Sequence, residues 1–269
     1  MKTLTLANQK GGVGKSAVAT QFAYYLNQCG LRVLIIDLDH QRNTTAPLVL
    51  SGKVQATAFT ASALLTTGGA DIPAGNFVLV PGDDNLSGLE RHADKHNDYV
   101  NHLHTFLADH ADRFDCCIID INPNPDVRYA AALVVSDYLI SPIQLNQEAI
   151  SGIGALLTHP RYGYHKIKSV INKKLSLLGL LPNMVEATPF QRDNFKQLAE
   201  SYAKLLIELD GKNGRYAFIP KRSAIAEAQA AGQPLFDLKK TAAREAWTEI
   251  KPVFDTIIKR MALEVKNGS

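Results

Sequence analysis

A glycine-rich segment near the N-terminus carries the residues best suited to bind phosphate. Residues 10–16 read Lys-Gly-Gly-Val-Gly-Lys-Ser, between an apolar run (Thr3–Ala7) and a segment of helical character (Ala17–Leu26). Glycines let backbone N–H groups surround a phosphate, and the N-terminus of the following helix adds partial positive charge. Lys15 is expected to reach the β- and γ-phosphates of a nucleotide, and the Ser16 hydroxyl to bind Mg²⁺. The predicted nucleotide-binding residues here are Gly11, Gly12, Val13, Gly14, Lys15, Ser16 and Ala17.

Lys10 is a second lysine in this loop, at a position where a phosphate loop does not require a charge. It therefore predicts a further phosphate contact, for example with the nucleotide of another subunit. The simpler alternative is a glycine-rich turn that binds nothing. That alternative does not account for the joint presence of Lys15, Ser16 and the flanking strand and helix.

Three aspartates stand at the ends of two other apolar runs. Asp120 follows Cys116–Ile119 in the form expected of a Walker B aspartate, which holds Mg²⁺ through water. The simpler alternative is that Asp120 caps the next helix and binds no metal. Asp37 and Asp39 are two residues apart, so both side chains point to the same side of their strand. We favour Asp39 for orienting an attacking water, because it lies further out at the carboxyl end.

These residues require a scaffold of buried strands joined by helices. Continuous apolar runs separated by helical segments favour a parallel sheet buried on both faces, with ligands at the carboxyl ends of the strands. We predict an α/β fold in one domain, residues 1–269, with a doubly wound, mostly parallel sheet and helices on both faces. Beyond residues 3–7, the predicted strands are 32–37, 77–81, 116–120, 138–142, 175–182 and 217–220.

Composition narrows the class of protein further. The chain has 269 residues, of which 46% are hydrophobic, and no apolar stretch of the roughly 18 residues that a membrane span needs. We therefore expect a cytoplasmic protein. The three cysteines lack the spacing of metal ligands and are predicted to be buried, reduced thiols. Residues 66–70 are predicted to form a surface loop.

Charge is distributed unevenly along the chain. Residues 1–150 contain 10 Lys/Arg and 15 Asp/Glu, whereas residues 151–269 contain 19 and 11. Ordinary solvated charge explains such a difference, but beside a nucleotide site it also indicates a surface for a polyanion. Apolar residues at helical spacing between Thr241 and Val265 predict a packed terminal helix, and a membrane-binding amphipathic tail is the alternative.

The motifs resemble those of a known family. Lys10–Ser16 resembles the deviant Walker A motif of the ParA/MinD ATPases, a class of P-loop NTPase, and Asp37–Asn43 resembles their Walker A′ segment. Further stretches are similar to ParA partition ATPases, and the resemblance spans nearly the whole chain. Within that family the chain is similar to the short form without an N-terminal operator-binding domain. The further stretches lie in residues 79–90, 141–144, 179–184 and 219–234.

The resemblance implies a mechanism with ATP and Mg²⁺ as cofactors. ATP would drive a face-to-face homodimer in which Lys10 crosses to the partner's phosphates, and Lys15, Lys10 and Asp39 would be catalytic. Asn183 and Pro220 would lie against the adenine. The dimer would bind double-stranded DNA without sequence preference on the nucleoid, and a ParB-like centromere-binding partner would stimulate hydrolysis. The candidate DNA-binding residues are Arg192, Lys196, Lys221, Arg222, Lys239 and Lys240.

The chain also departs from the family pattern. Asn122 follows Asp120 and Ile121 where two adjacent prolines are usual, and His40 and Arg42 replace a usual proline and glycine. Ala224 takes the place of a familiar DNA-contacting arginine, for which Lys221 and Arg222 are nearby substitutes.

Other functions remain open from the sequence. A MinD-like ATPase would act at a membrane. A metabolic phosphoryl-transfer enzyme or ligase of this fold, such as dethiobiotin synthetase, would need an acceptor pocket and leaves Lys10 without a purpose. A nucleotide-gated scaffold would position another cargo with little turnover.

Overall fold

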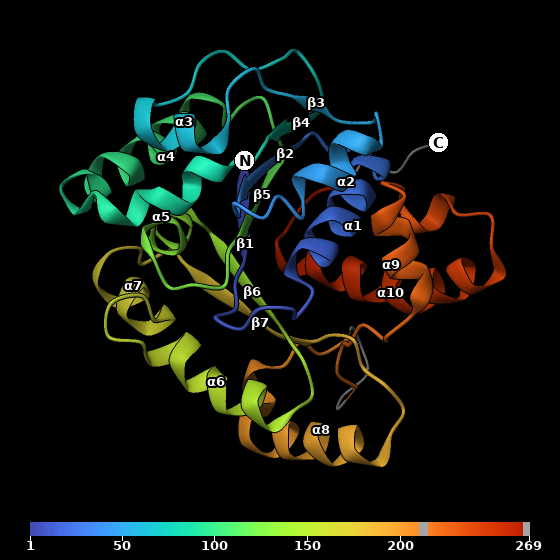
Figure 1. The fold of residues 1–269 in the computed structure, drawn as a ribbon. Helices are drawn as coiled ribbons and strands as arrows, with labels where there is room; N and C mark the ends of the chain where they lie inside the picture. The colour runs from blue at the N-terminus through green and yellow to red at the C-terminus, as the bar shows by residue number, and fades with distance from the viewer. Residues whose placement is uncertain (210–214, 266–269) are drawn as a thin grey trace.

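One seven-stranded sheet organises the chain. The computed structural model describes residues 1–209 and 215–265, and its strands lie in the order β3-β4-β2-β5-β1-β6-β7 with every pairing parallel (Figure 1). This confirms the predicted α/β architecture. The strands are β1 (Lys2–Leu6), β2 (Val33–Leu38), β3 (Gln55–Ala56), β4 (Phe77–Val80), β5 (Cys116–Ile121), β6 (Tyr138–Ile143) and β7 (Ser176–Pro182).

Helices cover both faces of this sheet. Helices α3 to α7 lie on one side, and α1, α9 and α10 lie on the other (Figure 1). None of the helices within the described ranges is both long and apolar enough to span a bilayer. The helices are α1 (Lys15–Gln28), α2 (Thr45–Leu50), α3 (Ala61–Thr67), α4 (His96–Asp109), α5 (Val127–Val135), α6 (Gln147–Thr158), α7 (Tyr164–Val170), α8 (Pro189–Tyr202), α9 (Ser223–Ala230) and α10 (Thr241–Arg260).

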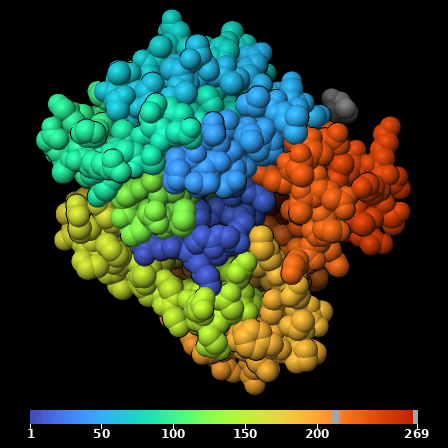
Figure 2. All heavy atoms as spheres, in the orientation of Figure 1, coloured from blue at the N-terminus to red at the C-terminus, as the bar shows by residue number. Residues whose placement is uncertain are grey.

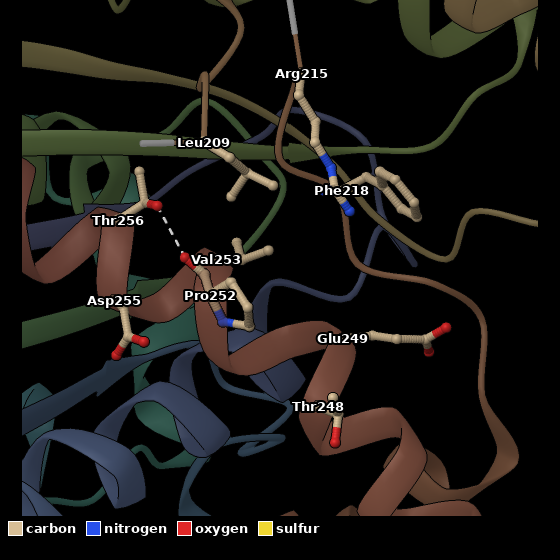
Figure 3. A pocket seen from close by; sticks show the side chains of 9 residues that line it. All are labelled: Leu209, Arg215, Phe218, Thr248, Glu249, Pro252, Val253, Asp255 and Thr256. Carbon is tan, nitrogen blue, oxygen red and sulfur yellow. Dashed lines mark hydrogen bonds between the residues drawn. The ribbon is translucent and has the colours of Figure 1, made fainter. Parts of the chain in front are cut away.

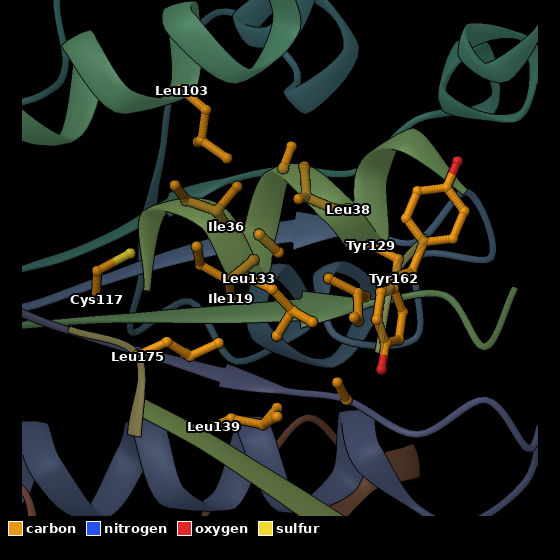
Figure 4. Packing of buried hydrophobic residues seen from close by; sticks show 14 of the residues in the cluster. Ile36, Leu38, Leu103, Cys117, Ile119, Tyr129, Leu133, Leu139, Tyr162 and Leu175 are labelled. Carbon is orange, nitrogen blue, oxygen red and sulfur yellow. The ribbon is translucent and has the colours of Figure 1, made fainter. Parts of the chain in front are cut away.

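Successive side chains of each strand point to opposite faces of the sheet, so the core consists of two halves, one on each face. Ile36, Cys117 and Ile119 face α4 and α5, in the packing that Figure 4 shows. Their chain neighbours Ile35 and Ile118 face the opposite way, toward α1 and α10. Because both faces are covered, consecutive strand residues are all buried, which explains the continuous apolar runs in the sequence.

The terminal helix is packed, as predicted. Ile250, Phe254 and Ile257 of α10 are buried, and the Phe254 ring lies 5.1 Å from that of Phe22 on α1. All three cysteines are free thiols, and Cys116 and Cys117 are buried as predicted, but the predicted burial is wrong for Cys29, which is half-buried near the end of α1.

Two predictions about local secondary structure were wrong. Residues 217–220 do not form a strand of the sheet. Their backbone N–H groups reach Ile207 and Pro182 one at a time, and Pro220 has no N–H with which to extend a ladder. The predicted loop at 66–70 begins later, because α3 continues to Thr67.

The sheet brings the functional segments to one edge. Asp120 of β5 lies opposite Leu6 of β1 and Asp37 of β2 in the strand register. The chain leaves β1 and β2 toward the same side, so Lys10–Ser16 and Asp39 meet at the carboxyl ends of neighbouring strands.

Candidate functional site

The glycine loop between β1 and α1 is held in a conformation that needs glycine. Gly12 and Gly14 have φ angles of 74° and 82°, in the left-handed region. A Cβ on Gly14 would lie 2.3 Å from Nδ2 of Asn183, whereas one on Gly12 would meet nothing within 4 Å. Asn183 Nδ2 donates a 2.7 Å hydrogen bond to the Val13 carbonyl. The residue that follows β7 therefore contacts the glycine loop and holds it in place.

Lys15 lies within this site rather than in solvent. Its side chain is buried at the start of α1, and burial lowers the pKa of its ammonium group, while the negative charges of Asp120 and Asp39 oppose that shift. A lysine between two carboxylates at a helix N-terminus is suited to a polyanionic ligand that carries a divalent cation.

Asp37 and Asp120 are both fully buried, and burial raises the pKa of each carboxyl. Their mutual negative charge adds to the rise at Asp37. The Thr44 hydroxyl donates to Asp120 Oδ2 at 2.7 Å, and the nearby Ser16 hydroxyl also lowers the pKa of Asp120. Among the described residues, Asp120 Oδ1 has no hydrogen-bond partner. Buried negative charge with an orphaned oxygen is unfavourable without a compensating positive ligand.

Asp37 and Asp39 differ in what their carboxylates already bind. Asp37 Oδ2 accepts from the backbone N–H and the hydroxyl of Thr45, at 2.8 and 2.7 Å, and its Oδ1 accepts from the Asp39 N–H at 3.0 Å. Asp39 Oδ1 accepts the Gln41 N–H at 3.0 Å. Asp39 lines the same cavity as the glycine loop. Asp37 is thus committed to holding the start of α2, which leaves Asp39 as the member of this pair that lines the cavity of the glycine loop.

Two adjoining cavities meet at the glycine loop. The first, of about 430 Å³, is lined by the loop together with Asp39 and Gln41. The second, of about 660 Å³, is mostly apolar and is lined by Asn183 and Pro220. Ala17 belongs to both, so the cavities lie side by side. Figure 2 shows the N-terminal segment (dark blue) exposed at the centre of this face, among segments coloured light blue, green and orange.

The donor set fits a nucleotide with one divalent cation. Within residues 1–209 and 215–265, no three His, Cys, Asp or Glu side chains are arranged to hold a metal by themselves. Mg²⁺ does not require such a cage, because it keeps several waters and takes one or two protein ligands beside substrate phosphates. The Ser16 hydroxyl and the orphaned oxygen of Asp120 would supply those ligands.

Lys10 is positioned outside the cavity of its own loop. Its Nζ donates to Glu148 Oε2 at 2.7 Å and to Asn146 Oδ1 at 3.2 Å, both at the start of α6. Lys10 does not line either nucleotide cavity. Its side chain is about a third exposed and Glu148 is almost fully exposed, so this ion pair is screened by solvent and costs little to open.

The predicted DNA-binding residues are all exposed but fall into two groups. Arg192 and Lys196 lie on α8, and the other four flank α9 and α10. In the described part of the chain, Arg192 and Lys239 form no ion pair. The other four predicted residues each form an ion pair. Lys196 lies 3.9 Å from Glu200, and the pairs Lys221–Glu186, Arg222–Glu249 and Lys240–Glu227 are each 2.6 Å long.

Three site residues were not predicted to act here. Thr44 binds Asp120, and its position just after the Walker A′-like segment was a usable signal. Gln144 donates to the Gly12 carbonyl at 3.1 Å from the end of β6. Met184 has a φ of 55° and lines both cavities, which no local pattern indicates.

A third cavity, of about 580 Å³, lies between α10 and the residues Leu209, Arg215 and Phe218 (Figure 3). Pro252 lies inside this helix, and its carbonyl accepts the Thr256 hydroxyl at 2.8 Å. None of the residues predicted for nucleotide, metal or DNA binding lines this cavity.

The fold and the site together define a P-loop NTPase with a deviant Walker A loop. Residues 1–177 match a family model described as "AAA domain". The chain is 34% identical over 275 residues to Protein IncC of Escherichia coli, covering 98% of this chain and 71% of that protein. It is 28% identical over 244 residues to the chromosome-partitioning ATPase Soj of Treponema pallidum (strain Nichols), covering 87% and 88%. The chain therefore belongs to the ParA-type partition ATPases, and it is an ATPase.

A solved structure agrees at the level of the fold. The ATP complex of a substituted McdA from Cyanothece superposes with a TM-score of 0.79 at 22% identity, over 100% of this chain and 99% of that one.

Proposed function

We propose that this chain is a DNA-bound positioning switch in the partition of plasmid or chromosomal DNA, acting in the cytoplasm on the nucleoid. ATP with Mg²⁺ binds at the glycine loop and stabilises a homodimer. The dimer binds double-stranded DNA without sequence preference. A ParB-like centromere-binding partner on the cargo stimulates hydrolysis, which ends the DNA-bound state. The kinship with IncC and Soj supports the partition role.

The observation that carries the proposal is the placement of Lys10. This lysine belongs to the loop by sequence, yet its ammonium lies at the start of α6 and outside the cavity that holds Lys15. A charge at the rim of a phosphate site is placed to meet the phosphates of a second molecule facing it. Dimerisation would exchange the solvent-screened ion pair with Glu148 for charge-assisted hydrogen bonds to phosphate, which are stronger where the interface excludes water.

The residues divide the chemistry among them. The backbone of the glycine loop and Lys15 would hold the phosphates, and Ser16 and Asp120 would hold Mg²⁺, which neutralises charge that develops on the phosphates. Asp39 would orient the attacking water. The apolar cavity beside Asn183 would receive the adenine.

The test compares DNA binding with ATP, with ADP and without nucleotide across a salt series. Wild-type protein is expected to bind DNA tightly only with ATP, and Lys10→Ala to lose ATP-dependent dimerisation and DNA binding while it still binds ATP. Lys53→Ala is the matched control, because Lys53 is also an exposed, ion-paired lysine. Equal DNA binding in all three nucleotide states would contradict the switch.

The alternative is that the same ATP-dependent switch binds a membrane instead of DNA. The apolar residues of α10 are buried against α1, so this helix has no free apolar face for a bilayer, which favours DNA. Co-sedimentation with anionic liposomes and with DNA, each in the presence of ATP, separates the two. Binding to liposomes alone would move the proposal to a MinD-like role.

A further inference from the structure

His40 lies between the two segments that flank the phosphate site. Its Nδ1 is 3.5 Å from Asp39 Oδ1 and 3.3 Å from Nη1 of Arg128 on α5. Its Nε2 is 2.9 Å from the side-chain amide of Gln41. All of the contacts described for this ring are polar, and the His40 side chain is 30% exposed. The ring is therefore held by hydrogen bonds and charge rather than by packing.

Arg128 gives this contact a rigid support. Its side chain is only 4% exposed, and its Nε and Nη2 both donate to Asp126 Oδ2, which also accepts from Asn122. Asp126 caps α5 by accepting the N–H of Arg128. The ring of His40 thus connects Asp39 at the end of β2 to the segment that follows Asp120.

We propose that His40 is a positioning residue for Asp39: its ring binds Arg128 when neutral and Asp39 when protonated, and so sets how available Asp39 is to the attacking water. This inference rests on the proposed role of Asp39.

The hydrogen-bonding capacity of Arg128 determines which partner the neutral ring of His40 binds and which partner the protonated ring binds. A guanidinium can only donate hydrogen bonds, so Nδ1 of His40 must be unprotonated to accept from Arg128. The proton of the neutral ring is then on Nε2, where the amide oxygen of Gln41 accepts it, since amide oxygen and nitrogen are exchanged by a simple flip. In this state Asp39 keeps Oδ1 on the Gln41 N–H and is otherwise available.

Protonation reverses the arrangement. Nδ1–H can no longer accept from Arg128 and would carry positive charge toward a buried cation, while Asp39 Oδ1 is the nearest acceptor. The new ion pair would occupy a lone pair of Asp39 and reduce its ability to accept a hydrogen bond from water. The charged groups at the ring are Asp39, Arg128 and Asp126, and Lys15 of α1 and Asp120 of β5 act on Asp39. Arg42 is paired with Asp84, and Glu90 accepts the Val127 N–H.

The experiment measures kcat and KM for ATP between pH 6.0 and 8.0 in wild type and in His40→Gln, which keeps an acceptor but does not titrate. Histidine changes charge between about pH 5 and 8. The ratio of kcat at pH 7.5 to kcat at pH 6.0 should be several-fold larger in wild type than in His40→Gln, with little change in KM. Any titration of Asp37 or Asp120 is common to both proteins and cancels in this comparison.

Two further variants complete the test. His40→Leu, which can bind neither Arg128 nor Asp39, should show the same flattened pH dependence of kcat as His40→Gln. His104→Gln is the control, because His104 is exposed on α4 and away from the site. Identical pH profiles in wild type and in either His40→Gln or His40→Leu would overturn the inference.

The variant Asp39→Ala distinguishes an error in the proposed role of Asp39 from an error in the proposed role of His40. If Asp39→Ala hydrolyses ATP at the wild-type rate, the proposed role of Asp39 is wrong and the inference about His40 falls with it. If Asp39→Ala is inactive but His40→Gln keeps the wild-type pH profile, only the role of His40 is wrong.

Discussion

Substituting the two left-handed glycines of the phosphate loop should have unequal costs. Any L-residue in the left-handed region costs about 1–2 kcal/mol, and this is the whole penalty expected for Gly12→Ala, whose Cβ would meet no atom within 4 Å. In Gly14→Ala the new Cβ would lie 2.3 Å from Asn183 Nδ2. The amide must then move, which breaks its 2.7 Å hydrogen bond to the Val13 carbonyl. Loss of that bond adds roughly 1–3 kcal/mol, because the carbonyl is left unpaired.

Urea unfolding of the nucleotide-free protein tests this difference. With a slope of about 3 kcal/mol per molar urea, Gly14→Ala should unfold at a midpoint on the order of 0.5 M below that of Gly12→Ala. In an Asn183→Ala background only the flexible end of Met184, with Cε at 3.1 Å, remains close to the new Cβ. Gly14→Ala should therefore cost about as much there as Gly12→Ala does in wild type. Equal midpoints for the two single variants, or an undiminished cost in the Asn183→Ala background, would refute the reasoning.

Other predictions concern the charged residues of the site. Lys15→Ala should abolish ATP binding in a calorimetric titration, whereas Asp39→Ala should bind ATP and DNA but stop turnover, and wild-type hydrolysis in the latter would exclude the proposed role. Lys239→Ala should lower DNA affinity by a few-fold and reduce the log–log salt slope by about 0.9, and an unchanged slope would remove it from the DNA surface. Burial raises the pKa of Asp37 and of Asp120. These two carboxyls therefore bind more protons in the folded than in the unfolded state above about pH 4, and their contribution to stability should fall as pH rises from there toward neutral. Asp120→Asn should flatten this fall in urea midpoints, and an unchanged pH dependence would contradict it.

Local sequence was sufficient for the features whose chemistry depends on near neighbours. The loop from Lys10 to Ser16 contains its own glycines, lysine and hydroxyl, and the strands could be read from apolar runs because both faces of the sheet are covered. The choice of Asp39 over Asp37 also followed from position along one strand. In the structure Thr45 occupies Asp37 and Asp39 lines the cavity, but the catalytic role of Asp39 stays a prediction.

Tertiary structure decided every contact between residues far apart in the chain. Asn183 reaches Val13 across 170 positions, and Arg128 reaches His40 across 88. The acidic partners of Lys221, Arg222 and Lys240 could not be foreseen either, because they are distant in the sequence: Glu186 lies before α8, Glu249 on α10 and Glu227 on α9. The failed strand at 217–220 has the same origin, since a ladder depends on which backbone lies alongside it. Local composition specifies which groups a segment can offer, and only the fold brings those groups within the few ångströms over which hydrogen bonds and ion pairs act.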